Sequence, residues 1–121
     1  MRTVVLSLVA VFFGGMGIYA LTAPAVLAKP FRLEVATPVS RYEIRAVYGG
    51  FGLAMAMVLI WSAVGDGAIH SGAALTVGMA LAGMAVGRVI SRLWDGPTAF
   101  YPIWFYCLVE AIGAAVVFTV A

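Results

Sequence analysis

Residues 3–28 read TVVLSLVAVFFGGMGIYALTAPAVLA and contain no charged side chain. A helix needs about 20 consecutive apolar residues to cross a bilayer, and this stretch exceeds that length. The preceding Arg2 and the closing VLA are also typical of a signal peptide, but the apolar part of a signal peptide usually holds only about 7 to 15 residues. We therefore expect this stretch to remain in the protein as a transmembrane helix.

Three further apolar runs follow along the chain. Residues 46–65 contain no Asp, Glu, Lys, Arg or His, residues 67–87 contain only His70, and residues 96–121 contain only Glu110. Over the whole chain 64% of the residues are hydrophobic and 10% are charged, whereas soluble domains carry about 25% charged residues. The composition therefore predicts an all-α integral membrane protein. We expect a single domain, residues 1–121, with transmembrane helices at about 3–28, 41–64, 68–93 and 98–120.

The connections between these runs predict the topology. Residues 65–67 (GDG) and 95–97 (DGP) are typical of tight turns, and short turns join antiparallel helices. We therefore expect an antiparallel up-down bundle of four helices. The longer connection, residues 29–39, alternates apolar and charged side chains and is expected to lie along the membrane surface. After it, Ser40 and Glu43 match a capping box and predict the start of the second helix.

Lysine and arginine are distributed unevenly between the two expected ends of the bundle. Cytoplasmic connections of membrane proteins carry an excess of these residues. Only Arg2 lies at the end that holds the termini, whereas the other end holds Lys29, Arg32, Arg41, Arg45, Arg88 and Arg92. The pattern predicts a multi-pass protein of the bacterial inner membrane with both termini on the periplasmic side. The net charge of +2 is too small to indicate a nucleic-acid partner.

Small residues at helical spacing indicate where helices approach closely, because lipid removes the hydrophobic drive for helix association. The second helix carries Gly49, Gly50 and Gly52 with Ala56, and the third carries Gly83 and Gly87 with Ser91. In the fourth helix Ala111 and Ala115 have the same spacing. We expect these residues to form seams inside one bundle; a homodimer seam is the alternative.

Ionisable residues at membrane depth are the candidates for chemistry, since each costs about 2.5 to 3.5 kcal/mol at a helix centre. Glu110 lies deep in the last apolar run, roughly 18 Å from the arginine-rich end at a rise of about 1.5 Å per residue. Arg88 lies roughly 10 Å from the same end, so that the two side chains can meet. Arg45 and Tyr48 share a helical stripe with Gly49 and are expected to face the same interior.

Residues 43–50 read EIRAVYGG, residues 87–88 read GR, residues 95–97 read DGP, and Glu110 follows in the last run. In combination these features resemble the small four-helix bacterial membrane family catalogued as domain of unknown function 4345 (DUF4345). The likeness extends over almost the whole chain. It implies the same four-helix architecture but no activity. The family-type positions that it marks are Glu43, Arg45, Tyr48, Arg88, Asp95 and Glu110.

Each of these positions also has a purely structural interpretation. Glu43 is a helix cap or an acid of the site, and Asp95 is a turn residue or part of the site. Arg45 and Arg88 with Glu110 form either a structural polar clasp or a site for a ligand or a proton. Cys107, one turn before Glu110, is interpreted as a small packing residue.

Three classes of function follow from this set. The first is a binding module that holds an anionic lipid headgroup or a small carboxylate among the Arg, Glu and Tyr side chains. The second is an accessory subunit that packs against a larger membrane complex. The third, a membrane enzyme or proton-coupled carrier using Glu110, ranks last, because the chain has no grouping of metal ligands, no phosphate-binding loop and no internal repeat. We predict no catalytic residue, metal or cofactor, with membrane lipids as the first partners.

Overall fold

A computed structural model describes all residues, 1–121, and every regular element is helical. Four segments are long and apolar enough to cross a membrane: Arg2–Thr22, Pro38–Val64, Ala68–Trp94 and Phe100–Val120. The chain is therefore a multi-pass membrane protein. Its elements are α1 (Arg2–Thr22), α2 (Pro24–Ala28), η1 (Lys29–Phe31), α3 (Pro38–Ile44), η2 (Arg45–Gly50), α4 (Phe51–Val64), α5 (Ala68–Trp94), η3 (Phe100–Trp104) and α6 (Phe105–Val120).

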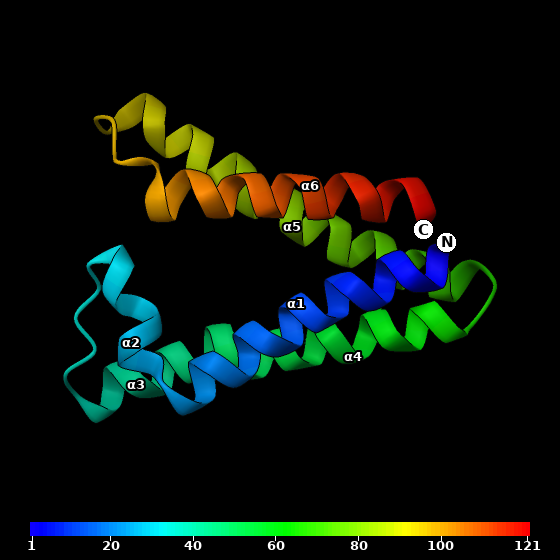
Figure 1. Cartoon of the computed structure of the whole chain (residues 1–121), viewed down its shortest axis with the longest axis horizontal. Helices are drawn as coiled ribbons and strands as arrows, with labels where there is room; N and C mark the ends of the chain where they lie inside the picture. Colours follow the sequence, from blue (N-terminus) through cyan, green and yellow to red (C-terminus); the bar gives the residue numbers. More distant parts are fainter.

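The four long helices form the expected antiparallel up-down bundle (Figure 1). Both termini lie at one end, together with the turn at residues 65–67, and we call this the terminal end. We call the opposite end the loop end; it holds α2, residues 29–37 and the turn at residues 95–99. Within the bundle α1 pairs with α4 and α5 pairs with α6, and Figure 1 shows the two pairs diverging toward the loop end.

The α1–α4 pair is close because glycines face each other. A Cβ atom on Gly17 would lie 2.9 Å from the carbonyl oxygen of Gly49, and one on Gly52 would lie 3.3 Å from the Gly17 Cα. Gly49 and Gly52 therefore lie in a seam with α1, and the glycines of α1 that complete this seam were not singled out in the sequence. Backbone contact of this kind replaces the hydrophobic drive that lipid removes.

Hydrogen bonds to the ends of helices fasten the same pair. At the loop end, Nε of Arg45 donates to the carbonyl oxygen of Leu21, 2.9 Å away, in the last turn of α1. At the terminal end, Arg2 and Thr3 donate to the carbonyl oxygens of Gly65 and Ala63, where α4 ends. The last carbonyl oxygens of a helix have no hydrogen-bond donor within the helix, and leaving them without one in lipid costs free energy. These side chains supply the missing donors.

The core lies where the two pairs meet. Leu6 of α1, Leu59 of α4, Val77 of α5 and Val117 of α6 are almost wholly buried and belong to one cluster. Many other apolar side chains are exposed on the outside of the bundle, as lipid contact requires. The polar residues discussed below lie between this core and the loop end.

Two helix boundaries differ from those expected from the sequence: the end of the first helix and the start of the second. The first helix was expected over residues 3–28, but it ends at Thr22, and a short helix begins at Pro24, whose ring cannot continue the hydrogen-bond pattern. The prediction of a capping box between Ser40 and Glu43 was wrong. Thr37 is the N-cap, and the hydroxyl of Ser40 accepts a hydrogen bond from the Thr37 amide. Proline at position 38 favours this earlier start, because proline fits the first helical turn.

The seam expected along α5 is absent from the folded chain. Gly83 and Gly87 face open space, with no atom within 4 Å of a Cβ built on either. Gly50 is also exposed and would meet only the Arg45 carbonyl, and Ala111 and Ala115 lie on the exposed side of α6. The reason is geometric: α6 packs instead around Gly78, where a Cβ would clash with Phe118 and Val117.

Candidate functional site

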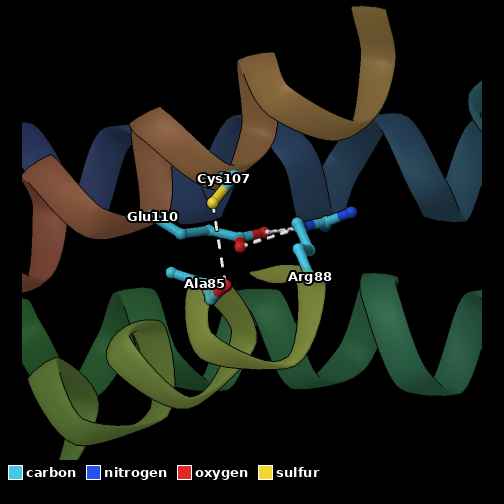
Figure 2. Close-up of polar contacts among 4 residues, drawn as sticks. All are labelled: Ala85, Arg88, Cys107 and Glu110. Atoms are coloured by element: carbon cyan, nitrogen blue, oxygen red, sulfur yellow. Dashed lines mark hydrogen bonds and ion pairs between the residues drawn. The ribbon is translucent and has the colours of Figure 1, made fainter. Parts of the chain in front are cut away.

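Arg88 of α5 and Glu110 of α6 form an ion pair, the only salt bridge in the chain (Figure 2). Nε of Arg88 donates to both carboxylate oxygens of Glu110, at 3.2 and 3.0 Å, and Nη2 donates to Oε1 at 2.8 Å. Two-pronged pairs of this kind are among the strongest hydrogen-bonded contacts in proteins. The Glu110 side chain is only 6% exposed and that of Arg88 22%, so Arg88 is the member that reaches the surface.

The helix directions explain why these two residues meet. Helical side chains lean toward the N-terminus of their own helix. The N-terminus of α6 is at the loop end, so the Glu110 side chain leans along α6 toward Arg88, as Figure 2 shows. The Glu110 side chain thereby spans the axial separation that the sequence indicated.

Cys107 fixes the spacing of the two helices next to the pair. Its Sγ donates to the carbonyl oxygen of Ala85 over 3.6 Å, as Figure 2 shows beside the ion pair. Cys107 is buried, and its small volume lets α6 approach the α5 backbone at this level. The packing role expected for Cys107 therefore agrees with its contacts.

Two aromatic rings flank the Arg88 guanidinium, and sequence reasoning missed both. Its Cζ lies 5.8 Å from the centroid of the Phe31 ring and 5.9 Å from that of Tyr106, distances at which a cation is attracted to a ring face. The two rings are 5.4 Å apart. Phe31 arrives here because the chain folds back after α1, and η1 packs against η3. The alternating pattern of residues 29–39 does not predict the contact between Phe31 and Arg88, because the two residues are brought together only by the folding of the chain.

A cavity of about 440 Å³ lies at the loop end beside Arg88, which is within the usual size range of small-ligand sites. Its walls come from the last turns of α5, the following turn, η3 and one residue of η2. Gly87 contributes no side chain, which widens the space. The polar groups in the wall are those of Tyr48, Arg88, Ser91, Arg92, Asp95 and Thr98, and the remaining lining residues are Met84, Gly87, Gly96, Ile103 and Trp104.

Three of the predicted site residues line this cavity: Tyr48, Arg88 and Asp95. Glu110 does not line it but forms the ion pair with Arg88. Arg92, which the sequence marked only as one of the basic residues at this end of the bundle, lines the cavity as well. No hydrogen bond engages Nη1 of Arg88 or the charged groups of Arg92 and Asp95. Charged donors and an acceptor in one wall are therefore available to a ligand.

Arg45 and Glu43 do not join the cluster, so the expectation that Arg45 and Tyr48 face one interior was wrong. Arg45 points to the end of α1, and Glu43 is exposed on α3. The cause is η2, a π-helical turn, whose hydrogen bonds skip one more residue than those of an α-helix. In this wider turn, two residues that are three positions apart in the sequence, such as Arg45 and Tyr48, point to different sides of the helix. The prediction of a shared stripe assumed the α-helical spacing.

The folded chain brings together no group of three His, Cys, Asp or Glu side chains that could hold a metal ion. No curated protein and no solved structure is detectably similar to the chain. One protein-family model, described as domain of unknown function (DUF4345), matches residues 1–121. Because this match covers the whole sequence, the chain belongs to the DUF4345 family.

Proposed function

We propose that the protein is a membrane binding module whose cavity at the loop end holds the anionic group of a lipid headgroup or of a small carboxylate. The observation that carries the proposal is the position of Arg88 and Arg92 in one cavity wall with the hydroxyls of Tyr48, Ser91 and Thr98. Guanidinium groups suit phosphate and carboxylate oxygens because they present several N–H donors in a fixed plane.

Glu110 has a positioning role in this proposal. Its carboxylate accepts hydrogen bonds from Nε and Nη2 of Arg88, which fixes the plane of the guanidinium and leaves Nη1 without a partner. A preorganised donor loses less conformational entropy when it binds. Arg92 is exposed and supplies the second positive charge.

The distribution of lysine and arginine between the two ends of the bundle supports a location of the cavity on the cytoplasmic side of the membrane. Of seven Lys and Arg residues, only Arg2 lies at the terminal end. The positive-inside rule then assigns the loop end to the cytoplasm and both termini to the periplasm of a bacterial inner membrane. A reporter phosphatase that is active only outside the cytoplasm should be active when fused after Ala121. An inactive C-terminal fusion that is expressed and membrane-inserted would reverse the assignment.

Native mass spectrometry of the protein extracted from vesicles of defined phospholipids tests the binding proposal. The wild-type protein should retain a phospholipid, and Arg92→Gln should retain severalfold less. Arg32→Gln is the matched control, because Arg32 is an exposed loop-end arginine outside the cavity. Equal retention by both variants and the wild type, or no retention by any, would overturn the proposal for lipids. Titration with a soluble dicarboxylate tests the carboxylate arm on the same proteins.

The accessory-subunit hypothesis is favoured by a different observation. Gly83 and Gly87 lie on a face of α5 where nothing in the chain covers them. A glycine pair at this spacing permits close approach by another transmembrane helix. Gentle extraction should then recover a partner chain or a second copy, and Gly83→Val should release it. Recovery of a lone 12.7 kDa chain under those conditions would reject this alternative.

A further inference from the structure

The charges in the cavity wall are of both signs. Arg88 is already compensated by Glu110, which leaves Arg92 and Asp95 as the uncompensated pair in the wall. Arg92 and Asp95 are three residues apart, but they do not form a salt bridge with each other. An anionic ligand placed beside Arg92 therefore has a carboxylate in the same cavity, and this carboxylate repels any second negative charge.

The end of α5 adds a backbone acceptor to the cavity wall. The carbonyl oxygen of Ser91 accepts from the Asp95 amide, but no backbone amide donates to the carbonyls of residues 92–94, of which Arg92 lines the cavity. Pro97 has no amide hydrogen and so cannot act as such a donor. Helix C-termini also carry a partial negative charge that favours cations. A group with positive charge and several N–H donors would satisfy this end of the cavity.

We infer that the ligand is a zwitterion that carries a phosphate or carboxylate at one end and a primary ammonium at the other. This inference rests on the proposed function and makes it more specific. The anionic end lies against Arg92, Nη1 of Arg88 and the Ser91 hydroxyl. The ammonium lies against the Asp95 carboxylate and the carbonyl of Arg92. A quaternary ammonium is a poorer fit, because it has no N–H to donate to these acceptors.

A competition between two phospholipids tests the inference. The full-length protein is equilibrated in vesicles of equimolar phosphatidylethanolamine and phosphatidylglycerol with identical acyl chains, and the retained lipid is identified by native mass spectrometry. The first headgroup is zwitterionic with a primary ammonium, and the second is anionic. The wild type should retain phosphatidylethanolamine in excess by roughly two- to fivefold, the range that an exposed ion pair provides.

Asp95→Asn removes the negative charge and should abolish or invert this preference while phosphate-dependent retention persists. Asp66→Asn is the control, because Asp66 is an exposed aspartate in the turn at the opposite end. Thermal unfolding of both variants verifies that they are folded. Asp95→Ala, read in the same way, replaces Asp95→Asn if that variant is unstable.

The outcomes separate the two levels of the proposal. Preference for phosphatidylglycerol in the wild type, or an unchanged preference in Asp95→Asn, overturns the zwitterion and leaves the binding module standing. Retention of neither lipid overturns both for lipids. Titration with soluble O-phosphoethanolamine and with glycerol 3-phosphate distinguishes a free ligand from a lipid. Selective binding of the former that is lost in Asp95→Asn supports the inference with a soluble source.

Discussion

Arg88 and Glu110 approach each other from two antiparallel helices, α5 and α6, and share three hydrogen bonds. Removing one partner from a buried pair leaves an uncompensated charge, which typically costs about 3 to 5 kcal/mol. We expect Arg88→Met, which leaves the buried Glu110 carboxylate unpaired, to destabilise the bundle by an amount in this range. Glu110→Leu should cost less, because Arg88 reaches the surface. Thermal or denaturant unfolding in detergent measures it.

The double variant Arg88→Met/Glu110→Leu provides the corresponding control. Because a buried ion pair can be replaced by apolar side chains at little net cost, the double variant should recover most of the stability that either single variant loses. Additive losses in the double variant would show that the two residues act separately, contrary to the contacts described above.

The glycine seam between α1 and α4 predicts a second effect on stability. Gly17→Val places side-chain atoms where a Cβ already comes within 2.9 Å of the Gly49 carbonyl oxygen, so the helices must separate. We expect a loss of about 1 to 3 kcal/mol, the usual cost of overpacking. Gly15→Val is the matched control, since nothing lies within 4 Å of a Cβ at Gly15. Equal losses in both variants would argue for an effect of valine on α1 itself.

Arg45 should contribute to stability and not to binding. Arg45→Met removes the bond to the Leu21 carbonyl and should cost about 1.5 to 3 kcal/mol, typical of a hydrogen bond to a charged group. Lipid retention should remain at the wild-type level, because Arg45 does not line the cavity. Loss of retention in a folded Arg45→Met protein would restore the interpretation that the sequence favoured, in which Arg45 belongs to the binding cluster.

Substitution of Phe31 tests whether the segment after α2 stabilises the protein through its contact with the Arg88 guanidinium. Phe31→Leu keeps an apolar side chain but removes the ring face, and we expect a loss of about 0.5 to 2 kcal/mol. Leu33→Ala, an exposed position two residues further on, should unfold at the wild-type temperature. If Leu33→Ala destabilised the protein as much as Phe31→Leu, the effect would belong to the loop as a whole and not to the Arg88 contact.

The sequence by itself determined the class of protein and the order of its parts. Four apolar runs of sufficient length, separated by two glycine-containing turns and one longer connection, leave few alternatives to an antiparallel helical bundle. Backbone groups in lipid must be satisfied within the segment, so an apolar run of this length is helical almost regardless of its detail. The depths of Arg88 and Glu110 along their helices also indicated that the two side chains can meet, and an unpaired charge at that depth is costly.

Only the tertiary structure decided which faces and which side chains come together. The π-helical turn at residues 45–50 directed Arg45 to the end of α1, and the packing of α6 around Gly78 left Gly83 and Gly87 uncovered. Phe31 reached Arg88 through a chain reversal that residues 29–39 do not encode as a local pattern. Rotation of a helix about its own axis depends on the sum of many weak contacts with its neighbours, because lipid surrounds apolar faces equally well. Sequence periodicity therefore identifies a helix, whereas the partner helices determine which of its sides is buried.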